Sequence, residues 1–253
     1  MDVDMNKRIV IITGASSGMG REFVKQLNDC LTTVDEIWVI ARREDRLLEL
    51  KKSNTKINLR LLPLDLCKEK DLEILKNKLK EENPKIRLLV NAAGVGRAGR
   101  FDEITTTEAT NMIDVNNKAL VAVTHMVLPY MSNKSNIIQI ASASAFMPQK
   151  EFAVYAASKS FVLSFSRALR AELKNSDIAV TVVCPGPVDT EFLAISNEGR
   201  EEKPLKKLVT AKVEPVVAKA LRDAKAGKEI SIYGLPMQTV WIASKLLPHG
   251  LFL

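Results

Sequence analysis

The sequence predicts an α/β fold with a doubly wound, seven-stranded parallel sheet and helices on both of its faces. Short β-branched runs alternate with longer segments of helical periodicity, which is typical of this fold class. Most of the runs are continuously apolar, as expected for strands that helices cover on both sides. With 253 residues and 46% hydrophobic content, the chain suits one globular domain over residues 1–253.

The predicted strands and helices follow one another along the whole chain. The seven strand-like runs cover residues 8–12, 37–40, 58–64, 86–90, 136–140, 178–183 and 229–232. Between them lie segments in which apolar residues recur every three or four positions, the clearest at residues 21–30, 68–82, 107–131 and 153–173.

Two segments lie outside this pattern. Residues 188–211 lack clear periodicity, and we predict that they form a substrate lid. Residues 236–253 are more apolar than a terminal segment normally needs, so we expect this tail to pack over the substrate cleft or against another subunit. An interfacial membrane helix is the alternative that Trp241 and Lys245 leave open, whereas charged and proline residues argue against a transmembrane helix.

Composition limits the compartment and the partners. Cys30, Cys67 and Cys184 have unrelated spacings, which indicates neither a disulfide framework nor a zinc site and favours a reducing, cytoplasmic location. The first residues do not resemble an export signal. The formal net charge is +7, but basic residues are scattered among acidic ones, which argues against a nucleic-acid partner.

A glycine-rich turn follows the first predicted strand directly. It reads Thr-Gly-Ala-Ser-Ser-Gly-Met-Gly over residues 13–20, and a helical pattern starts at once, so a helix N-terminus can receive the pyrophosphate of a dinucleotide. Glycines at such a junction can also serve the turn alone. The predicted cofactor-binding residues of this turn are Gly14, Ser16, Ser17, Gly18, Met19 and Gly20.

The end of the second predicted strand favours NADPH over NADH. In a NAD site an acidic residue about 20 positions past the glycines binds the adenosine ribose. Here Ala41 takes that place, and Arg42 and Arg43 follow. Loss of the carboxylate removes a charge that would repel a 2′-phosphate, and an arginine can bind that phosphate through two hydrogen bonds. The alternative is that both arginines merely begin a solvated helix.

Tyr155 and Lys159 lie four residues apart in a predicted helix, so their side chains share one face. A phenol has a reference pKa of about 10, and a neighbouring ammonium would lower it. We therefore predict that Tyr155 is the proton donor and acceptor of an enzyme and that Lys159 tunes its pKa. Such a pair also occurs in plain amphipathic packing, so other motifs decide.

These motifs together resemble the short-chain dehydrogenase/reductase family over essentially the whole chain. The other matching segments are Leu64-Asp65-Leu66, Asn91-Ala92-Ala93-Gly94, Asn116, Ser142 and Pro185-Gly186-Pro187-Val188-Asp189-Thr190. The resemblance implies a Rossmann fold and an oxidoreductase that interconverts a carbonyl and a secondary alcohol with NADP(H), on a small-molecule substrate and with no metal.

The resemblance also implies roles for single residues. Ser142 would hydrogen-bond the substrate oxygen, with a strand-end cap as its alternative role. Asn116 would hold a water that links Lys159 to solvent, and the adjacent Asn117 is the other residue that could match. For Asn91 a structural role between strands is at least as consistent as cofactor binding. The implied catalytic residues are Asn116, Ser142, Tyr155 and Lys159. The implied cofactor-binding residues beyond the turn are Arg42, Arg43, Asp65, Leu66, Asn91, Ala92, Gly94, Tyr155, Lys159, Pro185, Gly186, Val188 and Thr190.

The substrate and the quaternary structure are predicted only coarsely. We expect an apolar ketone, 3-oxoacyl derivative or steroid, and a homo-oligomer, dimer or tetramer, formed through the helices at residues 107–131 and 153–173. A catalytically silent NADPH-binding sensor or scaffold is the alternative in another class, and the retained catalytic residues argue against it. The residues expected to face the substrate, each of which could equally belong to the core, are Val95, Phe146, Met147, Phe152, Phe192 and Leu193.

Overall fold

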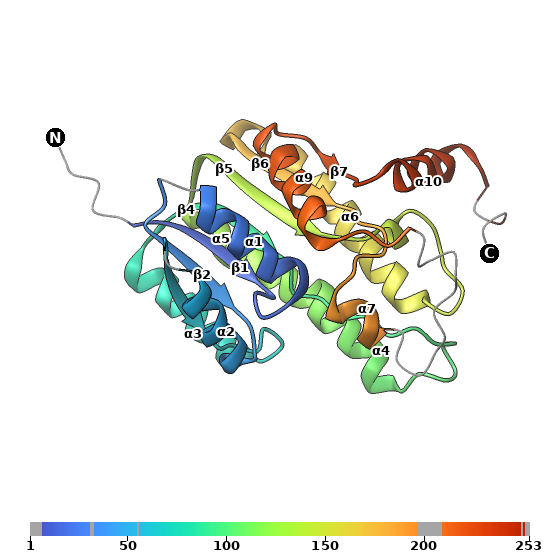
Figure 1. The fold of residues 1–253 in the computed structure, drawn as a ribbon, viewed down its shortest axis with the longest axis horizontal. Coiled ribbons are helices and arrows are strands. Elements are labelled where there is room, and N and C mark those ends of the chain that lie inside the picture. The colour runs from blue at the N-terminus through green and yellow to red at the C-terminus, as the bar shows by residue number, and fades with distance from the viewer. Residues whose placement is uncertain (1–6, 31–32, 55, 197–208, 249, 251–253) are drawn as a thin grey trace.

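A seven-stranded parallel sheet forms the centre of the molecule in the computed structural model, which describes residues 7–30, 33–54, 56–196, 209–248 and 250 (Figure 1). The strands lie in the order β3-β2-β1-β4-β5-β6-β7, and each neighbouring pair is parallel. The predicted fold class is therefore confirmed. The strands are β1 (Arg8–Thr13), β2 (Glu36–Ile40), β3 (Asn58–Leu62), β4 (Lys85–Asn91), β5 (Met131–Ile140), β6 (Ile178–Val183) and β7 (Ile230–Ser231).

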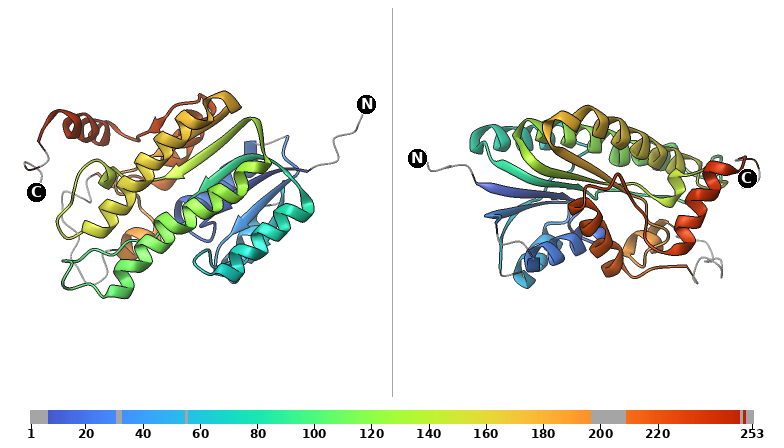
Figure 2. Two further views of the ribbon diagram at one scale, coloured as in Figure 1. Left: turned by 180° about the vertical axis from the view of Figure 1, so that it is seen from behind. Right: turned by 90° about the horizontal axis from the view of Figure 1, so that it is seen from above.

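Helices cover both faces of the sheet (Figure 2). In β1, Val10 and Ile12 belong to the core cluster on one face, and Ile9 and Ile11 belong to the cluster on the other. Because successive side chains of a strand point to opposite faces, a continuously apolar strand is buried on both. One face is covered by α1 (Gly18–Cys30), α2 (Glu44–Ser53) and α9 (Val213–Lys225), and the other by α3 (Glu69–Glu82), α5 (Leu120–Val127) and α6 (Ala153–Glu172).

The predicted helix over residues 107–131 is divided in the structure. It consists of α4 (Thr106–Ile113), a π-helical turn η1 (Asp114–Ala119), α5 and the short 3₁₀ turn η2 (Leu128–Tyr130). Pro129 lies in that last turn and cannot donate a backbone hydrogen bond, which is consistent with the helix ending there. Strand β5 consequently begins at Met131, earlier than predicted.

The segments predicted as lid and tail both contain a helix. Within residues 188–211 the structure describes α7 (Glu191–Ser196), and residues 197–208 lie outside the described part of the chain. A parallel bridge between Val188 and Ala211 joins the two ends of this segment. The tail contains α10 (Leu235–Leu246), and its residues 249 and 251–253 are outside the described part.

Helix α10 lies at the opposite end of the molecule from the start of β1 (Figure 1). Met237, Val240 and Trp241 of α10 pack against the core cluster that contains Val162 and Val182, whereas Leu235 and Leu246 are exposed. None of the described helices combines the length and the apolar character needed to cross a membrane.

Candidate active site

A cavity of about 960 Å³ opens at the carboxyl edge of the sheet. The strand order reverses between β1 and β4, and the crevice outside such a reversal is where ligands bind in open α/β sheets. Segments that follow β1 to β6 line the cavity because parallel strands all end at this edge. The predicted site residues in its lining are Gly14, Ser16, Ser17, Gly18, Met19, Arg42, Arg43, Asp65, Leu66, Ala92, Gly94, Ser142, Tyr155, Lys159, Pro185, Gly186, Val188 and Thr190.

The turn between β1 and α1 requires glycine at two places. Gly14 has φ of +67°, and a Cβ there would lie 2.6 Å from the backbone nitrogen of Ala93. A Cβ on Gly20 would collide with the backbone oxygen of Gly14. Gly20 does not line the cavity. Its lack of a side chain instead allows α1 to pack tightly against the turn.

Ser142 and Tyr155 meet in the cavity. Ser142 follows the end of β5, and Tyr155 lies in the first turn of α6. Burial raises the pKa of the Tyr155 phenol to about 12, and a hydrogen bond with the Ser142 side chain acts in the opposite direction. The Ser142 hydroxyl also accepts a hydrogen bond of 3.1 Å from the backbone N–H of Ser144, so the strand-end cap exists beside the contact with Tyr155.

Lys159 is buried one helical turn after Tyr155. Its Nζ donates a 2.9 Å hydrogen bond to the carbonyl of Ile140, and it lies 5.8 Å from the centre of the Tyr155 ring. Burial lowers the pKa of Lys159 to about 8. The sequence led us to expect that Lys159 lowers the pKa of Tyr155, but in this structure burial outweighs every other influence on the phenol.

Asn116 reaches the site from the π-helical turn η1. Its side-chain oxygen accepts from the N–H of Val95 at 2.9 Å, and its Nδ2 donates to the carbonyl of Val95 and to Ser158 Oγ, each at 2.9 Å. A Cβ on Gly94 would lie 3.3 Å from Asn116 Oδ1 and 3.4 Å from Lys159 Nζ, so all three converge. Asn117 instead donates to the backbone carbonyl of Ser158, which places Asn116 as the residue beside Lys159.

Asn91 points away from the cavity. Its Nδ2 donates to Thr124 Oγ1 at 2.9 Å and to Gln139 Oε1 at 3.0 Å, and the side chain is buried. Two roles were considered for Asn91, cofactor binding and a structural role between strands. The structure shows the second, because Asn91 of β4 bonds to Gln139 of β5 and to Thr124 of α5.

The comparisons with known proteins agree with this geometry. A family model described as short chain dehydrogenase matches residues 8–201. The chain belongs to this family. It is 34% identical over 196 residues to a protein named sulfoacetaldehyde reductase 2 from Chromohalobacter salexigens, with 76% of this chain and 77% of that protein covered.

Two further proteins are similar to this short-chain dehydrogenase. The NADP-dependent 3-hydroxy acid dehydrogenase YdfG of Escherichia coli is 34% identical over 219 residues, which cover 82% of this chain and 85% of that protein. A short-chain dehydrogenase from Sphingobium yanoikuyae, solved in complex with NADPH, superposes with a TM-score of 0.81 at 27% identity and covers 97% of this chain and 95% of its own.

In this short-chain dehydrogenase, apolar side chains line the part of the cavity around Tyr155. Phe152 and Phe192 flank the Tyr155 ring, with ring centroids 4.5 and 5.7 Å from it. Phe146, for which the sequence left both the substrate wall and the core open, is buried in a core cluster. Met237 and Val240 of α10 also line the cavity, and both belong to the tail that we expected either over the cleft or against another subunit. The apolar residues of the wall are Val95, Met147, Phe152, Phe192, Leu193, Ile195, Val209, Met237 and Val240.

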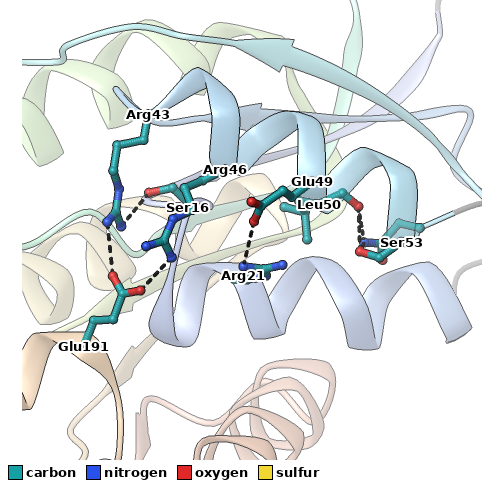
Figure 3. A network of polar contacts seen from close by, with 9 residues as sticks. Ser16, Arg21, Arg43, Arg46, Glu49, Leu50, Ser53 and Glu191 are labelled. Carbon is teal, nitrogen blue, oxygen red and sulfur yellow. Dashed lines mark hydrogen bonds and ion pairs between the residues drawn. The ribbon is translucent and has the colours of Figure 1, made fainter.

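The two predicted phosphate-binding arginines differ in their contacts. Arg42 lines the cavity and makes no hydrogen bond or ion pair within the described part of the chain. Arg43 donates to Ser16 Oγ at 3.3 Å and to Glu191 at 3.1 Å. Arg46 reaches the same Glu191 at 2.6 Å (Figure 3). Sequence reasoning missed Glu191 and Arg46, because neither belongs to a motif.

Proposed function

We propose that this protein is an NADPH-dependent oxidoreductase that interconverts a carbonyl and a secondary alcohol on an apolar small molecule. The convergence of Ser142, Tyr155 and Lys159 in one cavity carries the proposal, because it sets a phenol, a hydroxyl and a buried ammonium around one place where a substrate oxygen fits. A catalytically silent NADPH-binding protein would need none of these three groups.

The residues of the cavity fit a dinucleotide. The Gly14 backbone leaves no room for a side chain, α1 begins at Gly18 with its free N–H groups at the cavity, and Arg42 lies at the end of β2. The adenosine 2′-phosphate would lie at Arg42, at one end of the cavity, and the nicotinamide would lie beside Tyr155, at the other end. The names of two relatives, one NADP-dependent and one solved with NADPH, favour the phosphorylated form. When bound, the reduced nicotinamide supplies a hydride to the carbonyl carbon.

The side chains of this chain would handle the substrate oxygen and its proton. Tyr155, whose pKa of about 12 keeps it protonated at neutral pH, donates its proton to the oxygen as negative charge develops there. Ser142 donates a second hydrogen bond to the same oxygen. The Lys159 ammonium stabilises the phenolate that remains, and Asn116 holds the loop at Val95 beside this lysine.

The substrate class follows from the cavity wall. Two aromatic rings flank Tyr155, and aliphatic side chains complete the wall, which suits an apolar ketone, a 3-oxoacyl derivative or a steroid. We also propose that residues 188–211 act as a substrate lid. Phe192 and Leu193 of α7 line the cavity, and the bridge between Val188 and Ala211 holds the two ends of this segment together.

We further infer a homo-oligomer and a cytoplasmic location. Phe161 on α6 is exposed and stacks on Phe165, and Ile113 on α4 is exposed as well, which supports an interface along these helices. Within the described residues all three cysteines are free, which fits a reducing compartment. Light scattering on the purified protein measures the oligomeric state, and a monomer at micromolar concentration would contradict the interface.

A binding and turnover experiment tests the proposed function. The purified protein is titrated with NADPH and NADH by fluorescence, and NADPH oxidation is then followed with a panel of apolar ketones and 3-oxoacyl compounds. We expect tighter binding of NADPH and turnover of at least one compound. Tight binding without turnover on a broad panel would favour the sensor, and binding of neither nucleotide would overturn the proposal.

A further inference from the structure

Glu191 of α7 forms ion pairs with Arg43, one of the two predicted phosphate-binding arginines, and with Arg46. Its two carboxylate oxygens bind different guanidinium groups, Oε1 to Arg46 at 2.6 Å and Oε2 to Arg43 at 3.1 Å (Figure 3). The hydrogen bonds from Arg46 and Arg43 lower the pKa of Glu191, so the carboxylate is charged at neutral pH. One residue of α7 thus holds two arginines that lie 145 and 148 positions away in the sequence.

This cluster stands where an incoming phosphate would bind. Arg43 also donates to Ser16 in the glycine-rich turn, so the cluster borders the cavity beside that turn. The side chains of Arg43, Arg46 and Glu191 are 42%, 33% and 40% exposed, which leaves the ion pairs within reach of a ligand. A carboxylate that bridges two guanidinium groups uses the same donors that a phosphate would use.

The residue after Glu191 lies against the catalytic tyrosine. The Phe192 ring packs 5.7 Å from the Tyr155 ring, and a Cβ on Gly96 would lie 2.7 Å from Phe192 Cζ, so the phenyl group fills this place closely. At the other end of α7, the carbonyl of Ser196 accepts a 2.8 Å hydrogen bond from the N–H of Ala98. The first turn of α7 is therefore held by Glu191 on one side and by Phe192 on the other.

We propose that Glu191 is a specificity-determining residue through which the 2′-phosphate of the dinucleotide acts on the substrate side of the cavity; the inference rests on the proposed function. The phosphate, with its larger negative charge, replaces Glu191 as the partner of Arg43 and Arg46. Release of Glu191 loosens the first turn of α7 and with it the contact of Phe192 with Tyr155. A dinucleotide without the 2′-phosphate leaves the Glu191 ion pairs in place.

Two small ligands test this without any substrate. Adenosine 2′,5′-bisphosphate carries the 2′-phosphate and 5′-AMP lacks it, so calorimetric titration of the full chain with each isolates the effect of that group. In Glu191→Gln the neutral amide competes less strongly for the arginines than the carboxylate does, and it does not repel the phosphate. Since exposed charge pairs contribute little, we expect this variant to bind the bisphosphate about fivefold more tightly and 5′-AMP unchanged.

Glu49→Gln is the matched control. Glu49 is a second carboxylate of this region, on α2, and pairs with Arg21 of α1 at 3.9 Å rather than with α7 (Figure 3). Its substitution changes the net charge by the same amount without releasing α7. We expect a change in bisphosphate affinity of less than about twofold, because its charge lies farther from the Arg43 and Arg46 donors.

Amide hydrogen exchange of residues Glu191–Ser196 supplies the second readout. In the wild type, the bisphosphate should speed amide exchange in this helix, whereas 5′-AMP should not. In Glu191→Gln, the same helix should exchange fast even without a ligand. If Glu191→Gln binds like Glu49→Gln, or if both ligands affect α7 equally, the inference is wrong while the nucleotide site stands. If neither ligand binds, the proposed function fails and the inference fails with it.

Discussion

The side chain of Ser142 hydrogen-bonds the phenol of Tyr155, although Ser142 follows strand β5 and Tyr155 lies in helix α6. The contact sets the proposed proton donor and a second hydrogen-bond donor at one point of the cavity. It also opposes the effect of burial on the phenol, because a hydrogen bond to the charged form lowers a pKa whereas desolvation raises it.

Tyr155→Phe should abolish turnover and keep nucleotide binding. The change removes the proton donor but keeps the ring that packs between Phe152 and Phe192, so we expect kcat to fall by about 10² to 10⁴-fold. Steady-state kinetics and a nucleotide titration measure the two effects. Tyr233→Phe, outside the cavity lining, is the control and should retain full activity. Residual activity above a tenth of wild type would contradict the assigned role.

Ser142→Ala and Ser144→Ala separate the substrate contact from the strand-end cap. The Ser142 hydroxyl forms a hydrogen bond with the Tyr155 phenol, so we expect Ser142→Ala to lower kcat by about 10²-fold, as for loss of one donor to a developing oxyanion. Ser144 contributes its backbone N–H to Ser142, and its substitution should leave kcat nearly unchanged. Equal losses in both variants would indicate a structural role for this loop rather than a contact with the substrate.

The buried ammonium of Lys159 should make stability depend on pH in a defined window. Its pKa is about 8 in the folded protein and about 10.4 in an unfolded chain. The unfolded state therefore binds more protons between these values, and the folded state gains stability as the pH rises through them. The full difference corresponds to about 3 kcal/mol.

Lys159→Met tests that sign. The variant lacks the titrating group, so its free energy of unfolding relative to wild type should be higher at pH 7 than at pH 10.5, by a difference of about 3 kcal/mol. Urea unfolding at both pH values measures it. The exposed Lys174→Met is the control and should show no such difference. A relative stability that rises with pH would refute the depressed pKa.

Asn91→Ala should destabilise the protein without weakening nucleotide binding. The change leaves Thr124 and Gln139 without the amide that bridges them in the core, which we expect to cost about 1–3 kcal/mol. Chemical unfolding and an NADPH titration measure the two quantities. If the variant lost nucleotide affinity at unchanged stability, Asn91 would instead have a role in cofactor binding.

Arg42→Ala should weaken NADPH and spare NADH. The guanidinium has no ion-pair partner within the described residues, so it is available for a 2′-phosphate, and loss of a charged hydrogen bond should weaken NADPH about ten- to hundredfold. Lys52→Ala, at the far end of α2, is the charge-matched control. An equal effect on both nucleotides would mean that Arg42 acts elsewhere than on the phosphate.

Much of the site could be predicted because the motifs are local and the sheet is parallel. Most of the motifs directly follow an apolar strand, and parallel strands end at one edge, so residues as distant as Gly14 and Ser142 line the same cavity. Helix boundaries were less predictable. The π-helical turn at Asn116 lies inside a continuous helical segment, between α4 and α5, so the recurrence of apolar residues every three or four positions gives no sign of it.

The sequence by itself determined the fold class, the order of the motifs and which side chains are candidates for the chemistry, because burial of apolar strands and residue chemistry are encoded locally. Only the tertiary structure decided that Asn91 faces the core, that Asn116 rather than Asn117 lies beside Lys159, and that burial dominates the pKa of Tyr155. It alone placed Glu191 on Arg43 and Arg46. These features depend on which distant segments pack together, and no short stretch of sequence carries that information.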